Sequence, residues 1–333
     1  MTSVSKLRDP TLRAALILLG TIAVLTVVSQ GSGRFLNIAT IFSVMQLFAT
    51  LGLVALGLGL SMLIREFDIS VAGMVSVAGC VGVMTGVDNP WLGVLFGVAT
   101  GLAGGLAQGL IIVWLRLSSV GVTLGGLLTF GGIAHMLTRN RSIPYANIDV
   151  ALAVNDPILG ILSPRGAVAL AVFVVAALVI SHTRIGRDVI ATGGDRDASR
   201  IAGVNVDRIT VGVFTVSGGL AALTGVLLSY SLAAASPVGL ADVLVPGTAA
   251  AIIGGVSLSG GRGRPMGILA GVLVLGVLRS GLNALGVSPY VHEIATGAVL
   301  LSVAILDGSA LGRRVTEWRL GLNGKVMRPT TGA

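Results

Sequence analysis

Charged residues of both signs are concentrated in one segment between two apolar stretches, residues 184–208 (RIGRDVIATGGDRDASRIAGVNVDR). The stretch 192–195 (TGGD) should break the chain, and Asp195 can then cap a helix that starts at Arg196. Gly203 can end this helix after about two turns, because glycine readily adopts the left-handed conformation of a helix C-terminus. One side of the helix would be apolar, formed by Ala198, Ile201 and Ala202. Such a helix outside a membrane can dock a partner protein, and an ordinary solvated loop is the alternative.

The sequence lacks the motifs of nucleotide, metal and covalent chemistry. There is no G-x-x-x-x-G-K-[ST] loop to hold nucleotide phosphates, and only two lysines occur in the chain. His135, His182 and His292 are isolated and lack the H-E-x-x-H spacing of a zinc site. Cys80 is the single cysteine, so neither a disulfide nor a Cys-based metal site can form within the chain. We therefore predict no catalytic, cofactor-binding or metal-binding residue.

Ionisable and polar residues are rare within the apolar stretches. Arg279 lies well inside one stretch, so it should face a polar interior rather than lipid. Three acids lie at expected helix ends, where we expect water to reach them: Asp68, Asp242 and Asp307. Five uncharged polar residues are candidates either for lining a path or for hydrogen bonds between helices: Gln46, Gln108, Thr123, Asn283 and Thr296.

The composition and the apolar stretches predict the fold class. Hydrophobic residues make up 54% of the 333 residues and charged residues only 11%, against about 25% charged residues in typical soluble domains. Ten stretches are candidates for membrane crossing: 12–30, 38–63, 69–88, 91–115, 118–138, 166–183, 209–232, 243–259, 265–285 and 290–306. The sequence thus predicts an all-α, polytopic transmembrane bundle in a single domain, 1–333. Glycine pairs on both sides of residues 139–165 are compatible with two similar halves, and the stretch 243–259 is short enough to be re-entrant.

The basic residues predict the orientation of the bundle. With a cytoplasmic N-terminus and ten crossings, seventeen of the 22 lysines and arginines fall inside, four fall outside, and Arg279 lies in a helix. This bias is the one that the positive-inside rule requires. Residues 184–208 and the tail 312–333 would be cytoplasmic, and 139–165 would be an external loop. Because the arginines lie between apolar stretches rather than on one soluble face, no nucleic-acid partner is predicted.

Four motifs occur in a characteristic order along the chain. They are FDISV at 67–71, TLGG at 123–126, the segment from Gly186 to Ile209, and a Gly-rich block at 252–290 that ends in GLNALGVSPY. From about residue 40 to 308 the chain resembles the ribose-type (monosaccharide) ABC transporter permeases. Two positions depart from the pattern of this family. Pro246 replaces an acid, and Glu66 stands where many members have Gly.

The resemblance implies a subunit of the bacterial cytoplasmic (inner) membrane that translocates a sugar or a similar small polar solute by alternating access. Its partners would be a second permease subunit (homo- or heterodimer), cytoplasmic ATPase subunits that carry ATP and Mg, and an extracytoplasmic solute-binding protein. We expect this binding protein to dock on 139–165, because that loop is the only sizeable segment predicted outside. The residues that couple to the ATPase would be Gly194, Asp195, Ala198, Arg200, Ala202 and Gly203. Asp68 and Ser70 fall on the family's D-[LI]-S motif.

Two alternative functions remain from the sequence. An ion-coupled secondary transporter would need an acid deep within the membrane, and the sequence identifies none. An ABC permease for a non-sugar solute, such as a branched-chain amino acid, would have the same composition.

Overall fold

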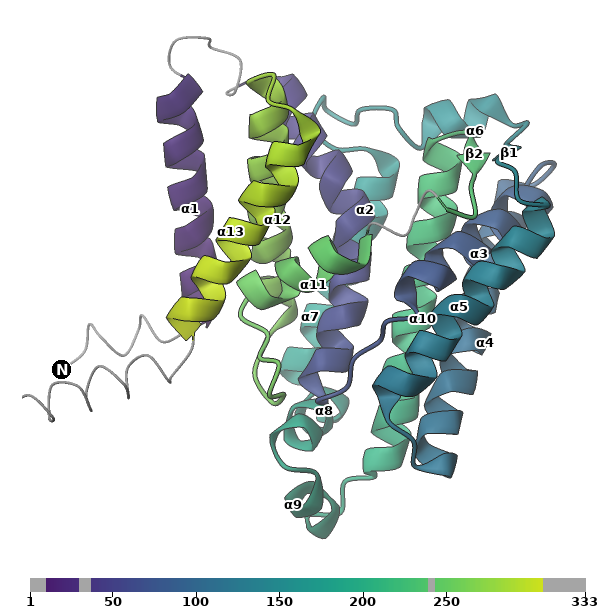
Figure 1. The fold of residues 1–333 in the computed structure, drawn as a ribbon, viewed down its shortest axis with the longest axis vertical. Coiled ribbons are helices and arrows are strands. Elements are labelled where there is room, and N and C mark those ends of the chain that lie inside the picture. The colour runs from purple at the N-terminus through teal and green to yellow at the C-terminus, as the bar shows by residue number, and fades with distance from the viewer. Residues whose placement is uncertain (1–9, 30–36, 239–242, 308–333) are drawn as a thin grey trace, which may run out of the picture.

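The computed structural model describes residues 10–29, 37–238 and 243–307, so Asp242 and the tail 312–333 lie outside the described residues. The longer helices are α1 (Pro10–Ser29), α2 (Ile38–Leu63), α4 (Pro90–Leu115), α5 (Ser119–Thr138), α7 (Pro164–His182), α10 (Val206–Ser231), α12 (Pro265–Ala284) and α13 (Pro289–Asp307). The shorter ones are α3 (Val71–Thr85), α6 (Ile148–Ala153), α8 (Arg184–Gly194), α9 (Arg196–Ile201) and α11 (Leu244–Ile253). Strands β1 (Ile143–Pro144) and β2 (Ala234–Ala235) form the one sheet among these residues (Figure 1).

The predicted helical membrane bundle is confirmed. Each of the ten apolar stretches contains a helix, and six of the described helices are long and apolar enough to cross a membrane. The span predicted at 69–88 is wrong in length, because α3 has only 15 residues and covers about 22 Å of a hydrocarbon core that is about 30 Å thick. The stretch at 243–259 is short as expected, with ten residues in α11. The two similar halves stay a prediction.

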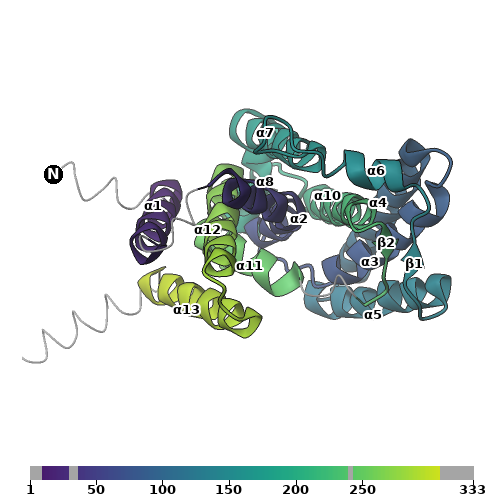
Figure 2. The ribbon, with the colours of Figure 1, turned by 90° about the horizontal axis from the view of Figure 1, so that it is seen from above.

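Helix α10 lies at the centre of one side of the bundle, against α2, α3 and α4 (Figure 2). Close backbone approach holds these helices together. A Cβ atom at Gly101 of α4 would overlap the carbonyl oxygen of Gly218 of α10, and a Cβ at Gly218 would overlap the carbonyl of Gly101. Small residues allow this packing in a membrane, where the hydrophobic effect gives helices no reason to associate.

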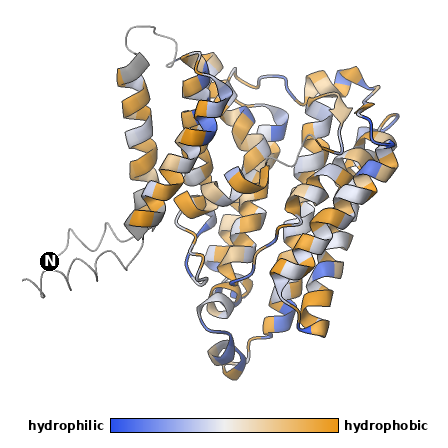
Figure 3. Ribbon diagram, in the orientation of Figure 1, coloured by the Kyte–Doolittle hydropathy of each residue, from blue (hydrophilic) through white to orange (hydrophobic). Residues whose placement is uncertain are grey.

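The two polar segments lie at opposite ends of the bundle. Helix α6 and the β1–β2 sheet are at one end, and α8 and α9 are at the other (Figure 1). Hydrophilic residues are concentrated at these ends, whereas the bodies of the helices are mostly hydrophobic (Figure 3). Which of the two ends faces the cytoplasm stays a prediction. In the following, the end with α6 is called the α6 end and the end with α9 the α9 end.

A tyrosine pair fixes the 139–165 loop to the bundle. Tyr145 of the loop and Tyr230 of α10 stack with ring centroids 4.5 Å apart and planes 9° apart. The Tyr145 hydroxyl donates to the Gly86 carbonyl (2.8 Å), and the Tyr230 hydroxyl donates to the Pro90 carbonyl (2.9 Å). The loop is therefore tied both to α10 and to the turn between α3 and α4.

Candidate functional site

The linker between α2 and α3, residues 64–70, is the first part of the candidate site. The chain leaves α2 through Arg65, whose φ of 61° ends the helix. The linker then runs from the α9 end towards the middle of the bundle (Figure 1). Backbone that is not helical must find other hydrogen-bond partners at this depth. Polar side chains of the neighbouring helices provide them.

Asp68 is buried at the end of this linker, with only 2% of its surface exposed. Its Oδ1 accepts hydrogen bonds from the backbone N–H (3.1 Å) and the hydroxyl (2.6 Å) of Ser70, and its Oδ2 accepts from the hydroxyl of Ser217 in α10 (2.7 Å). The expectation that Asp68 is solvated was wrong. It sits at a helix end, but that helix, α3, begins inside the bundle, and α10 covers the carboxylate.

Two further candidates from the sequence lie at the same place. The hydroxyl of Thr123 in α5 donates to the carbonyl of Phe67 (3.2 Å). Gln108 of α4 and Ser70 both lie against the backbone of Gly126, where a Cβ atom would contact both side chains. We call Asp68, Ser70, Gln108, Thr123 and Ser217 the linker cluster. It joins the linker with α4, α5 and α10.

Gln108 differs from the other members because its amide has no partner. It is 4% exposed, and neither its Nε2 nor its Oε1 is hydrogen-bonded within the described part of the chain. A buried polar group without a partner costs about 1–3 kcal/mol. Gln108 is therefore the member of the linker cluster whose side chain can still accept and donate hydrogen bonds.

The remaining polar candidates lie elsewhere. Gln46 belongs to a network at the α6 end, where its Oε1 accepts from Arg165 Nε (2.7 Å) and from the Ser163 hydroxyl (3.1 Å). Asn283 is exposed near the end of α12, and the Thr296 hydroxyl bonds within its own helix. Arg279 pairs with Glu293 of α13 (2.9 Å) rather than facing a polar interior alone. Of the five uncharged polar candidates, only Gln108 and Thr123 therefore lie together, in the linker cluster.

The segment 184–208 folds as two short helices at the α9 end. Asp195 caps α9 as expected, since its Oδ1 accepts from the backbone N–H groups of Asp197 and Ala198 (both 3.0 Å). Gly203 has φ of +86° after the helix, as its predicted role requires. The predicted break at 192–195 begins too early, because α8 continues through Gly194. Gly193 lies so close to the Leu63 carbonyl that a Cβ atom there would overlap it, so this glycine serves packing rather than a turn.

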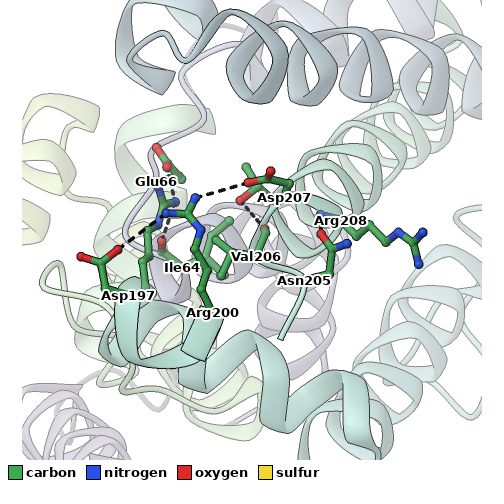
Figure 4. A network of polar contacts seen from close by, with 10 residues as sticks. Ile64, Glu66, Asp197, Arg200, Asn205, Val206, Asp207 and Arg208 are labelled. Atoms are coloured by element: carbon green, nitrogen blue, oxygen red, sulfur yellow. Dashed lines mark hydrogen bonds and ion pairs between the residues drawn. The ribbon is translucent and has the colours of Figure 1, made fainter. Parts of the chain in front are cut away.

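The coupling-loop residues named from the sequence are on the free side of α9. Ala198, Arg200, Ala202 and Gly203 are exposed, and Ile201 next to them is 89% exposed. Arg200 extends between two acids, Asp197 (3.6 Å) and Asp207 (3.4 Å), as Figure 4 shows. Ile201 is thus an exposed apolar side chain in a segment that also carries these charged residues.

The other side of this segment contacts the end of α2. Gly261 N–H donates to the Leu63 carbonyl (2.9 Å), and Arg65 donates to the Gly194 carbonyl (2.6 Å) and to the Ser259 carbonyl. Arg196 donates to the Ile64 carbonyl (3.3 Å) and forms an ion pair with Glu66. Gly194 and Arg196, together with Ser259 and Gly261 of the loop between α11 and α12, are thus bonded to the point where the linker begins.

Comparison with known proteins identifies the family. A family model described as branched-chain amino acid transport system, permease component, matches residues 40–304. The chain belongs to this permease family. The permease is also 31% identical to the ribose import permease protein RbsC of Escherichia coli K12, over 87% of this chain and 92% of the relative. No solved structure matches it.

Further relatives agree with this assignment. The permease is 34% identical to the ribose import permease protein RbsC of Bacillus subtilis 168, over 87% of this chain and 91% of the relative. It is 31% identical to the L-arabinose transport system permease protein AraH of Escherichia coli K12, over 77% of this chain and 78% of the relative. The resemblance inferred from the sequence motifs is confirmed.

Membership of the family fixes the class of function. The permease is the transmembrane component of an ABC importer and not its catalytic subunit, and the family carries no cofactor on this component. It is a multi-pass membrane protein related to bacterial inner-membrane permeases, and the family implies ATPase and binding-protein partners. The family thus decides against the ion-coupled alternative.

Two residues of the linker and its contacts, Ser217 and Glu66, were not identified as candidates from the sequence. Ser217 lies in a run of small residues, VSGGLAA, that reads as helix packing. Glu66 was noted only as a departure from the family pattern. No spacing rule relates either residue to its partner, because Asp68 and Ser217 are 149 positions apart and Glu66 and Arg196 are 130 apart.

Proposed function

We propose that this permease imports a monosaccharide or a similar small polar solute by alternating access. An ATPase docked on α9 would drive the change between states. The observation that carries the proposal is the position of the capped helix α9. It exposes Ala198 and Ile201 on one side, and the segment that leads into it is bonded on the other side to the start of the linker.

The proposed orientation places the α9 end in the cytoplasm, with both termini inside. The basic residues support it, since arginines recur in the segments assigned to that side. The solute-binding protein would then meet the α6 end, where residues 139–165 form the longest segment between spanning helices on that side. The anchoring of this loop by Tyr145 gives the partner an ordered surface.

We infer that a second permease subunit covers α5. Among the six long spans of the described residues, α5 is the least buried. A Cβ atom at Gly121, Gly125 or Gly132 would meet nothing within 4 Å. Because Thr123 of α5 belongs to the linker cluster, a path between two subunits would pass close to this cluster. Cysteines introduced on α5 should then cross-link between subunits, whereas cysteines on the exposed face of α7 should not.

The proposed solute class rests on the names of the relatives and on the linker cluster. Two relatives are named for ribose and one for L-arabinose. Hydroxyl and amide groups of the cluster match the donors and acceptors of a sugar. The description of the family favours a branched-chain amino acid as the second candidate.

Uptake by proteoliposomes separates these candidates. The permease would be reconstituted with its ATPase and binding protein and given labelled ribose, arabinose or leucine, with ATP inside or outside the vesicles. ATP-dependent uptake of a pentose is expected. Uptake of leucine alone would reject the sugar proposal, and uptake driven by a proton gradient without ATP would reject the ATPase coupling.

A further inference from the structure

Glu66 and Asp68 are two residues apart in the linker and contact different parts of the molecule. Glu66 forms an ion pair with Arg196, the first residue of α9. Asp68 accepts a hydrogen bond from Ser217 in the middle of α10. The linker is therefore joined to the α8–α9 segment by the Glu66 ion pair and by the hydrogen bonds of Ile64 and Arg65, and to the central helix by Asp68.

The ion pair is shielded from water on the linker side. Glu66 is 11% exposed in its side chain and Arg196 is 35% exposed, so solvent screens their attraction less than it screens a surface pair. The same Arg196 nitrogen donates to the Ile64 carbonyl (3.3 Å), which fixes the guanidinium to the end of α2. Loss of one partner from such a pair leaves the other charge uncompensated. The pair should thus hold the two segments in one arrangement.

The flanking elements are regular helices, whereas the linker is not helical. Helix α9 is fixed at its start by the Asp195 cap and by the Ser199 hydroxyl, which donates to the Asp195 carbonyl (2.6 Å). Helices α2 and α3 are both largely buried. The linker between them is not helical, and its second residue, Arg65, has a positive φ. A displacement of α9 would therefore be taken up by the linker.

We propose that the Glu66–Arg196 ion pair transmits the position of α9 to the linker, and through Asp68 and Ser217 to α10. Glu66 is then a positioning residue for transport and contacts neither solute nor nucleotide. The inference rests on the proposed function, because it assumes that an ATPase moves α9. Within the described part of the chain, this is the ion pair that joins the linker to the α8–α9 segment.

Hydrogen–deuterium exchange on the assembled complex tests the proposal without knowledge of the solute. The permease would be purified with its ATPase partner, and exchange would be compared with and without a non-hydrolysable ATP analogue. In the wild type, peptides that cover 184–208 and 64–70 should both change. In Glu66→Gln the change at 184–208 should persist and the change at 64–70 should be lost. The charge-swapped variant Glu66→Arg/Arg196→Glu should regain the response of the linker.

A matched control is available at the other side of the bundle. Glu293→Gln removes the carboxylate of the Arg279–Glu293 pair, far from α9, and should leave both responses unchanged. An equal linker response in Glu66→Gln and wild type would overturn the inference. Loss of complex assembly in Glu66→Gln would also overturn it, because the ion pair would then only stabilise the fold. A charge-swapped variant whose linker does not respond would overturn it as well. Failure of the wild type to bind an ATPase would instead refute the proposed function.

Discussion

The hydroxyl of Ser217 in α10 lies 2.7 Å from Asp68 Oδ2 and donates to it, at a position where both side chains are buried. This hydrogen bond links the non-helical segment between α2 and α3 to the helix that packs against α2, α3 and α4. Because a carboxylate at this depth has no water to compensate a lost donor, its partners set the stability of the region.

Ser217→Ala should therefore destabilise the protein by about 1–3 kcal/mol, since it leaves a buried carboxylate oxygen without a donor. The measurement is the thermal unfolding midpoint of the protein in detergent. Ser302→Ala is the matched control, because Ser302 is exposed and bonds only to the Ala298 carbonyl of its own helix. Equal midpoints for the two variants would contradict the role of Ser217.

Gln108→Leu should have opposite effects on stability and transport. Both amide atoms of Gln108 lack partners among the described residues, so an apolar side chain of similar size should keep or raise the thermal midpoint. If the amide meets the solute, ATP-driven pentose uptake should fall severalfold. Gln46→Leu provides the contrast, because it removes the acceptor of Arg165 and Ser163 and should lower the midpoint. Normal uptake by Gln108→Leu would remove this residue from the path.

Ala198→Glu should abolish uptake while the protein still inserts into the membrane. The substitution places a charge on the exposed apolar side of α9, where the ATPase is proposed to dock. Co-purification of the ATPase with the tagged permease measures the effect. Ala153→Glu changes an exposed alanine of α6 at the opposite end and should retain the ATPase. Unchanged uptake by Ala198→Glu would reject α9 as the docking element.

Gly193→Ala should separate α8 from the end of α2. An added Cβ would overlap the Leu63 carbonyl and come within 2.6 Å of Gly261 N, and overpacking of this kind costs about 1–3 kcal/mol. Gly194→Ala is the neighbouring control, because a Cβ there meets nothing within 4 Å. Proteolysis of residues 184–208 should accelerate in the first variant only. Equal cleavage rates would show that this contact does not hold the segment.

Tyr145→Phe should loosen the 139–165 loop. It removes a buried hydrogen bond to the Gly86 carbonyl and leaves the ring stack intact, so the free energy of unfolding should fall by about 1 kcal/mol. Tyr145→Ala removes the stack as well and should cost about 3–5 kcal/mol. The rate of protease cleavage within the loop measures the effect of both Tyr145 variants. Tyr290→Phe, at an exposed tyrosine, is the control. Identical cleavage of the Phe and Ala variants would show that the stack does not anchor the loop.

Much of the fold could be predicted because membrane helices are encoded locally. A crossing needs a continuous apolar stretch, and each of the ten predicted stretches contains a helix. The capped helix α9 was predicted for a similar reason, since Asp195, the turn of helix after it and Gly203 are consecutive in the chain. The length of α3 was overestimated, because Ile69 and Ser70 extend the apolar stretch but belong to the linker, and the helix begins only at Val71.

The sequence alone determined the membrane class, the order of the helices and the family. It did not determine the linker cluster, the burial of Asp68 or the ion pair between Glu66 and Arg196. Those contacts join residues far apart in the chain, and a helix end in the sequence does not reveal whether water or another helix covers it. Only the packing of α10 and α9 against the linker decided that Asp68 is buried and that Glu66 has a partner.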